Sequence, residues 1–165
     1  MARVVDQVRD DGAMFRRALF VNADASDTAR LLTRQVLDKW GLAELQDDAE
    51  TIVGEFVANV AAVQAQGTLF GLRLILDRTW VVIEVHDHSA DEPRWPAPAQ
   101  ELDLLAESGR GLFMVRALAN QYGHRFTSGR IKIVWATLSV PFAYGNGPES
   151  VTEAGRAPSS VSECR

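Results

Sequence analysis

Cysteine, basic charge and long apolar runs are all scarce in this 165-residue chain. The only cysteine is Cys164, next to the C-terminal residue, so the sequence offers neither an internal disulfide nor a thiolate metal site. The formal net charge of −5 leaves no basic face of the kind that duplex nucleic acid or an anionic membrane surface requires. No apolar run approaches the roughly 20 residues of a membrane helix, and the N-terminus lacks the apolar core of a signal peptide. We therefore expect a cytosolic protein that binds small ligands or other proteins.

Histidine is also sparse. None of the three histidines, His86, His88 and His124, has the spacing of metal ligands on a helix. His86 and His88 would share one face of a strand, and we interpret them as edge or pocket-lining residues.

The length predicts a single domain with a substantial core. We expect a flexible leader over residues 1–13, an ordered domain over residues 14–143 and a disordered tail over residues 144–165. Gly, Pro, Ser and Glu dominate the tail without any period. Apolar alternation predicts strands over residues 14–21, 69–77, 80–87 and 131–140. Helical periodicity predicts one helix that Ser26 or Asp27 caps and Gly41 ends, and a second over residues 46–66, with Gly67 at its end.

The segment from Glu107 to Val115, ESGRGLFMV, joins two glycines to the first turn of an apolar helix. Gly109 and Gly111 let the backbone approach a ligand closely, and the free N–H groups at the helix start carry a positive partial charge. This combination predicts an anion cradle with a phosphate as its ligand. An ordinary glycine loop before a helix is an alternative that the motif alone leaves open. We expect the helix to run to Gln121 and to end at Gly123.

The helix expected over residues 46–66 carries two polar residues at the margin of its apolar face. Glu55 and Asn59 are four residues apart, so one lies a turn above the other. A carboxylate and a carboxamide at this spacing can orient a water and ligate a hard cation such as Mg²⁺. A plain surface pair is the alternative, and the spacing alone favours it. Asn is, however, a poor residue for a helix interior, so its presence there asks for a reason.

The strand expected over residues 80–87 ends at Asp87, which places a carboxylate at a strand end, where ligand-binding residues commonly lie. The following segment contains Pro93, Pro96 and Pro98 and cannot form regular structure. We interpret residues 90–108 as a lid.

These pieces, taken in order, resemble the GHKL (histidine-kinase-like) ATPase fold: a helix with Glu55 and Asn59, a strand ending at Asp87, a proline-rich loop, and then ESGRGLFMV. The likeness extends over about residues 22–140 and points to the short anti-sigma-factor serine kinases of actinobacteria. Lys132 and Trp135, in IKIVWATL, resemble the terminal strand of that group. The resemblance and the periodicity agree on an α/β two-layer sandwich, a mixed or antiparallel sheet with helices packed on one face.

The resemblance also implies roles for individual residues. Glu55 matches the general base, and Asn59 matches the ligand of a Mg²⁺ ion between the phosphates of ATP. Asp87 matches the acceptor for the adenine amino group. Gly109 and Gly111 match glycines that line the phosphates. We further expect the phosphates on the backbone from Gly109 to Leu112, and we add the hypothesis, which the resemblance does not supply, that Arg110 is an extra cation for the γ-phosphate.

Two features depart from the pattern of that family. Val63 stands where these proteins commonly have a histidine, four residues after the asparagine, so a polar helper is missing. His88, Ser89 and Ala90 stand where glycines usually follow the aspartate and open the adenine pocket. The second departure predicts an altered adenine site.

Together these features predict an ATP-binding kinase-like domain over residues 14–143. The leading function is a serine/threonine protein kinase that phosphorylates an anti-anti-sigma (STAS-domain) protein, binds a sigma factor, and so regulates transcription by partner switching. The alternative is a non-catalytic module that sequesters a sigma factor or another regulator, which Val63 favours. A detached catalytic domain of a two-component histidine kinase ranks third, because the leader resembles no phosphoacceptor helix hairpin. The sequence leaves open the partner and whether the chain forms a homodimer.

Overall fold

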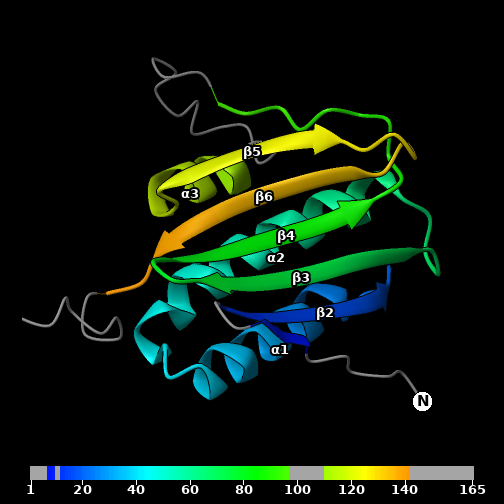
Figure 1. The fold of residues 1–165 in the computed structure, drawn as a ribbon. Coiled ribbons are helices and arrows are strands. Elements are labelled where there is room, and N and C mark those ends of the chain that lie inside the picture. Colours follow the sequence, from blue (N-terminus) through cyan, green and yellow to red (C-terminus); the bar gives the residue numbers. More distant parts are fainter. Residues whose placement is uncertain (1–6, 10–11, 97–109, 142–165) are drawn as a thin grey trace, which may run out of the picture.

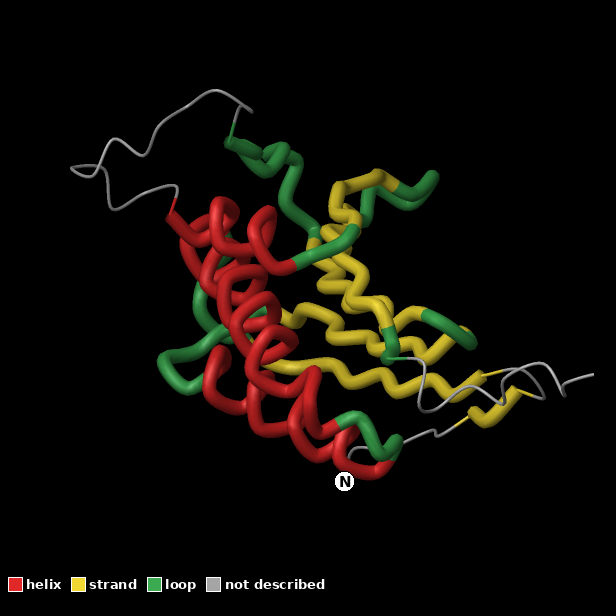
Figure 2. The backbone as a smooth tube through the Cα atoms, turned by 90° about the vertical axis from the view of Figure 1, so that its left-hand side faces the viewer, coloured by secondary structure: helices red, strands yellow, loops and turns green. Residues whose placement is uncertain are grey.

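The structure, a computed structural model, describes residues 7–9, 12–96 and 110–141. In this part of the chain, a six-stranded sheet forms one layer and the helices form the other (Figure 1). Seen edge-on, all the described helices lie on the same side of the sheet (Figure 2). Every strand pair is antiparallel, which confirms the predicted two-layer α/β sandwich. None of the helices in the described ranges is both long enough and apolar enough to cross a lipid bilayer.

The sheet has the strand order β1-β2-β3-β4-β6-β5, so the last strand of the described residues lies between β4 and β5. The hairpin of β3 and β4 matches the predicted limits at both ends, and Arg78 in its turn has a φ of 43°. The strands are β1 (Gln7–Arg9), β2 (Gly12–Phe20), β3 (Leu69–Asp77), β4 (Trp80–Asp87), β5 (Gln121–Phe126) and β6 (Lys132–Ser139).

The first long strand, β2, begins two residues earlier than predicted and ends one residue earlier. Val21, the residue after it, is buried and its N–H donates to the carbonyl of Thr68, so it anchors the chain before the first helix. Residues 7–9, which the sequence assigns to the leader, form the short edge strand β1 against β2.

The first helix, α1 (Ala25–Lys39), does not use the predicted cap. Ser26 and Asp27 lie inside the helix, and the turn before it is held by Asn22, whose side-chain oxygen accepts from the N–H of Asp24 at 3.0 Å. The prediction was wrong because the asparagine, which precedes both expected caps, already folds the backbone into the entering turn. The helix ends as predicted, where Gly41 takes a φ of 71°.

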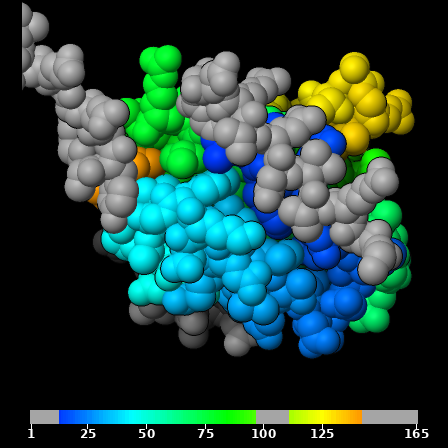
Figure 3. Space-filling model, turned by 60° about the horizontal axis from the view of Figure 1, so that its bottom comes forward, coloured from blue at the N-terminus to red at the C-terminus, as the bar shows by residue number. Residues whose placement is uncertain are grey.

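After a single 3₁₀ turn, η1 (Ala43–Leu45), the helix α2 (Gln46–Val63) runs through the middle of the helical layer. It contacts α1 on one side and α3 (Arg110–Leu118) on the other. Ile52 and Phe56 on α2 are at most 1% exposed, as are Leu74 and Ile83 on the sheet. Each such side chain contributes roughly 1.5–3 kcal/mol through its burial. This packing fixes the helix that carries Glu55 and Asn59, while α1 and the start of α2 cover one side of the molecule (Figure 3).

The predicted helix over residues 111–121 is wrong in its last turn. Helix α3 ends at Leu118, and Tyr122 and Gly123 belong to strand β5, where they pair with Ala136 and Trp135. Asn120 donates its N–H to the carbonyl of Thr137, which starts the pairing with β6. The apolar residues near Tyr122 suit a strand as well as a helix, and the partner strand decides between them.

Candidate nucleotide site between α2, α3 and the end of β4

Glu55 on α2 lies directly against Gly111 in the first turn of α3. A Cβ atom built on Gly111 would lie only 2.9 Å from Cδ of Glu55 and closer still to its Oε2. A contact this short does not occur between real atoms, so only glycine allows α3 to begin here beside an undisturbed Glu55. The structure therefore brings together two of the predicted site residues from distant parts of the sequence.

The carboxylate of Glu55 is not engaged by any other residue in the described part of the chain. Its side chain is only partly buried, and it forms no ion pair or hydrogen bond with any residue that the structure describes. A carboxylate without such a partner has the open lone pairs that a general base needs.

Asn59 lies one turn further along α2 and is exposed. Its carboxamide likewise has no partner within the described part of the chain, so its oxygen is available as a ligand. The described residues contain no group of three or more His, Cys, Asp or Glu side chains that could hold a metal ion. A cation at Asn59 would therefore take most of its ligands from phosphate oxygens and water, which is the usual coordination of Mg²⁺.

Asp87, the last residue of β4, is 1% exposed, and its two carboxylate oxygens differ. Oδ1 accepts from the side-chain amide of Gln64 at 3.2 Å and from the N–H of Ser89 at 2.7 Å. Oδ2 is buried and accepts no hydrogen bond from the described residues; the ammonium of Lys132 lies 3.4 Å away as an ion pair. Leaving a buried acceptor unpaired costs about 1–3 kcal/mol. Oδ2 is thus the atom at which a donor from a ligand would be most stabilising.

The residues that replace the usual glycines after Asp87 fit their backbone without strain. Among the described non-glycine residues only Arg78 and Arg130 have positive φ, so His88, Ser89 and Ala90 occupy ordinary conformations. Ser89 shapes the turn twice, because its N–H donates to Asp87 and its hydroxyl accepts from the N–H of Asp91 at 3.1 Å. The polar turn replaces glycine flexibility with side-chain hydrogen bonds.

The described start of the predicted lid, residues 90–96, is irregular in conformation and is attached to the domain through Trp95. The indole packs edge-on against Phe56 of α2 at 6.5 Å and lies 4.7 Å from the ring of Tyr122 on β5. Its Nε1–H donates to Nδ1 of His124 at 3.2 Å. An aromatic residue with both ring contacts and a hydrogen bond is a firm anchor. Residues 97–108, the rest of the predicted lid, lie outside the described residues.

The predicted phosphate cradle is described only in part. Gly109 lies outside the described residues, and of Arg110 the structure describes only the backbone at the start of α3. Gly111 and Leu112 form the first turn of α3, and Leu112 is 6% exposed because it packs into the core. The roles of Gly109, Arg110, Gly111 and Leu112 toward phosphate stay predictions.

A separate charged cluster lies on the other face of the sheet, centred on Glu84. Its carboxylate contacts Nη2 of Arg125 at 2.7 Å, Nε2 of His86 at 2.9 Å and Nη1 of Arg73 at 3.5 Å. Burial alone raises the pKa of Glu84, but the hydrogen bonds from His86 and Arg125 and the charges of Arg73 and Arg125 outweigh burial and lower the pKa to about 2. The sign of the charge on this side chain is therefore fixed at any physiological pH. His86 serves this cluster, and His88 beyond the strand is exposed.

Three residues near the site were not singled out as functional from the sequence: Gln64, Trp95 and Lys132. Lys132 stood out only as part of a familiar strand pattern, although a lysine inside the apolar run IKIVWATL is itself a signal of a buried ion pair. Its register opposite Asp87, which no sequence pattern shows, comes from the pairing of β4 with β6. Gln64 and Trp95 gave no signal, because both act through contacts made only in the folded chain.

The comparisons with known proteins agree with this architecture. Residues 21–138 match the family model described as the histidine kinase-like ATPase domain, which covers most of the chain. The chain therefore belongs to the family of histidine kinase-like ATPase domains. No curated protein matches it.

Proposed function

We propose that the chain is an ATP-dependent serine/threonine protein kinase of the anti-sigma-factor type, which phosphorylates an anti-anti-sigma (STAS-domain) protein and thereby controls a sigma factor. Membership of an ATPase-domain family supports nucleotide binding. The single observation that carries the kinase step is the carboxylate of Glu55, unpaired among the described residues, beside the glycine in the first turn of α3. A pure binding protein has no physical need of such a carboxylate at that place.

The residues present fit ATP and Mg²⁺. The buried Oδ2 of Asp87 accepts no hydrogen bond from the described residues and suits a donor such as the adenine amino group, and the glycine at position 111 lets the first turn of α3 begin beside the Glu55 carboxylate. Asn59 would hold the metal ion. Bound Mg-ATP would supply an activated phosphoryl group and the charge neutralisation that its transfer requires.

The part of the chemistry that this chain performs is positioning and proton transfer. A serine or threonine oxygen of the substrate forms a bond to the γ-phosphorus as the bond from that phosphorus to the bridging oxygen breaks, and ADP departs with the bonding electrons. Glu55 accepts the hydroxyl proton at its carboxylate. The N–H groups at the start of α3 carry the positive partial charge of a helix N-terminus. They would therefore stabilise the negatively charged phosphates of the nucleotide.

A direct test is to incubate the purified protein with γ-labelled ATP, Mg²⁺ and a panel of STAS-domain proteins from the same organism. We expect label on a serine or threonine of one of them. The protein would bind ATP but transfer no label to any member of a complete panel if the proposed kinase step were wrong.

One observation favours the second candidate, a module that sequesters a sigma factor or another regulator without catalysis. The last turn of α2 exposes Ala61, Ala62 and Val63, and the Val63 side chain is 49% exposed. An apolar turn at the surface is suited to a protein partner. The two candidates differ over Glu55: sequestration would survive Glu55→Gln unchanged, whereas partner switching would fail.

A further inference from the structure

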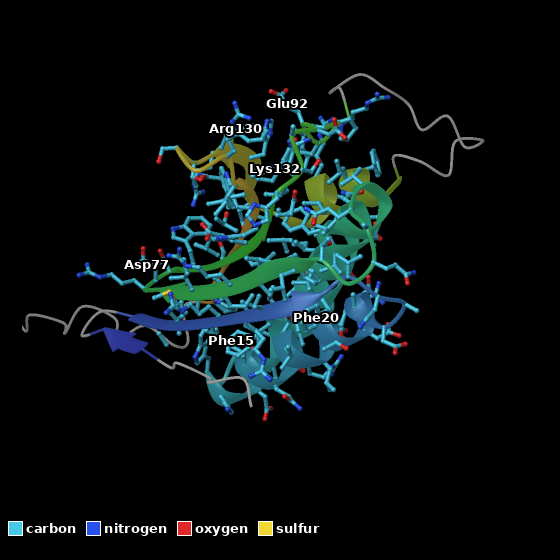
Figure 4. All side chains as sticks on the ribbon, turned by 90° about the vertical axis from the view of Figure 1, so that its right-hand side faces the viewer. Phe15, Phe20, Asp77, Glu92, Arg130 and Lys132 are labelled. Carbon is cyan, nitrogen blue, oxygen red and sulfur yellow. The ribbon has the colours of Figure 1, made fainter. Side chains whose placement is uncertain are left out.

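Lys132 at the start of β6 is an unusual residue for its position. It is 6% exposed, and lysine is rarely buried unless it is paired. Its Cα lies opposite that of Asp87 in the register of β4 and β6, so the two side chains face the same end of the helical layer. Lys132 and Glu92 of the 88–96 segment lie on the same side of the molecule (Figure 4).

The ammonium group of Lys132 has one donor left over. An ammonium has three N–H groups. One donates to the carbonyl of Asp91 at 2.9 Å, and one is directed toward Oδ2 of Asp87 at 3.4 Å without forming a hydrogen bond. The third has no partner among the described residues. Among the described residues, a buried carboxylate oxygen without a hydrogen bond therefore lies beside a buried ammonium with one N–H that has no partner.

We propose that Lys132 is a specificity-determining residue that reads the purine base together with Asp87. Asp87 accepts from the exocyclic amino group of adenine, and Lys132 donates to the neighbouring ring nitrogen, N1. This inference rests on the proposed binding of ATP and assigns the second of the two hydrogen bonds that define the base.

The chemistry of the base edge favours adenine over guanine in this arrangement. The Watson–Crick edge of adenine presents a donor, the amino group, next to an acceptor, N1. An acceptor from Asp87 beside a donor from Lys132 is its complement. Guanine presents the two in reverse order, an oxygen acceptor next to an N–H donor, so in the same orientation it places acceptor against carboxylate and donor against ammonium. Sites that hydrogen-bond a specific group reject analogues that cannot pair with it, because buried polar groups are then left unpaired.

A purely structural ion pair between Lys132 and Asp87 is the competing explanation. Such a pair would stabilise the fold and orient Asp87, but it would be indifferent to the atom at position 1 of the base. The two explanations are therefore separated by changing the ligand rather than the protein, which avoids any effect on folding.

The experiment measures the affinities of the full chain for Mg-ATP, 1-deaza-ATP and 7-deaza-ATP. In 1-deaza-ATP a C–H replaces N1, and 7-deaza-ATP is the control because its altered atom lies on the other edge of the base. We expect 1-deaza-ATP to bind about 10- to 100-fold more weakly than ATP, and 7-deaza-ATP to bind about as tightly as ATP. In Lys132→Met, which keeps the length of the side chain, ATP and 1-deaza-ATP should bind equally weakly. Lys39→Met, at the exposed lysine on α1, should preserve the wild-type preference.

Two outcomes would overturn the inference, and they differ in what else they overturn. Wild-type protein that binds ATP and 1-deaza-ATP with equal affinity would remove the role of Lys132 while leaving the proposed function intact. Wild-type protein that binds none of the three nucleotides would remove the proposed function and this inference with it. Lys132→Met leaves the buried carboxylate of Asp87 without a counter-charge and is therefore expected to be less stable. The wild-type affinities for ATP and 1-deaza-ATP test the role of Lys132 even if this variant does not fold.

Discussion

The carboxylate of Glu55 occupies the volume that a side chain on Gly111 would need. The relationship links the middle of α2 to the first turn of α3 and makes the position of the carboxylate depend on the absence of a single methyl group. A site built on such a close approach is sensitive to small additions of volume, because any atom added at Gly111 must displace the carboxylate.

Gly111→Ala should therefore displace the Glu55 carboxylate from its position beside α3. We expect at least a roughly tenfold loss of phosphoryl transfer but a change of no more than about 1 kcal/mol in the free energy of unfolding, because the group that must move is the end of a flexible side chain and alanine favours the helix. Thermal unfolding and a transfer assay measure the two effects. Gly129→Ala is the matched control, because a Cβ there would meet only Thr127 Oγ1 at an ordinary 3.7 Å. Equal behaviour of the two variants would show that the Glu55 contact has no consequence.

Glu55→Gln separates chemistry from binding. Glutamine has the same size but cannot accept the proton, so phosphoryl transfer should fall by ~10² or more while ATP affinity hardly changes. Single-turnover transfer and nucleotide titration check the two parts. Glu44→Gln, at an exposed residue of η1, should change neither. A Glu55→Gln protein with normal transfer would assign the general base to another residue.

Asp87→Asn should weaken ATP binding by at least about tenfold and reduce the preference for ATP over GTP, because the amide places a donor where the adenine amino group needs an acceptor. The variant should also be less stable, since Lys132 would be buried without its counter-charge. Calorimetry with both nucleotides and denaturant unfolding measure these effects. Asp91→Asn serves as control, because Lys132 contacts only the backbone carbonyl of Asp91. Equal affinity of the wild type for ATP and GTP would count against the assigned role.

Glu84 makes the stability of the fold depend on pH in acid. The pKa of its carboxyl group is about 2 in the folded chain, against an ordinary value of 4.5, so the native state favours the ionised form. The stabilisation is therefore complete above about pH 5 and is lost as the pH falls toward about 2. The difference in unfolding free energy between wild type and Glu84→Gln should be constant near neutral pH and shrink below about pH 4.5. A difference that stays constant down to about pH 2.5 would contradict this account.

Nucleotide should slow amide hydrogen exchange over residues 90–108. The segment includes the Trp95 anchor and leads to the start of α3, so bound phosphates would add contacts at its far end. Hydrogen exchange followed by mass spectrometry, with and without saturating ATP, measures the change. Trp95→Ala should raise exchange over residues 88–96 in both conditions, since the ring contacts and the bond to His124 are lost. Exchange over residues 90–108 that ATP leaves unaltered would argue against a lid.

The sequence predicted most where a signal is local. The hairpin of β3 and β4 is marked by alternation on both sides of a short turn, and the glycine at position 41 marks the end of α1. It predicted least where the same residues could form a helix or a strand and contacts with a distant segment decide between the two. The apolar residues around Tyr122 allow helix or strand until β6 supplies a partner, and Asn22 competes with Ser26 as the residue that starts α1.

In the candidate site, too, the sequence predicts which residues take part but not how they are placed relative to one another. Glu55, Asn59 and Asp87 were predicted as site residues from their residue types and their order along the chain, and these roles stay predictions. Their placement follows from the fold: Glu55 meets Gly111 across two helices, and Asp87 meets Lys132 across two strands. Lys132 could not be assigned beforehand, since its importance depends on a register between strands that no periodicity encodes.

The place of β6 between β4 and β5 has a consequence during synthesis of the protein. When β4 has left the ribosome, Asp87 still lacks Lys132, and β5 later lacks its neighbouring strand, because both are supplied by β6, which is translated after them. A nascent chain that stops before residue 132 therefore has an open sheet edge on β4 and an uncompensated carboxylate beside it. If Asp87 and Lys132 read the base as proposed, nucleotide recognition requires insertion of β6, and a prematurely terminated chain would not compete with the finished protein for the same ligand.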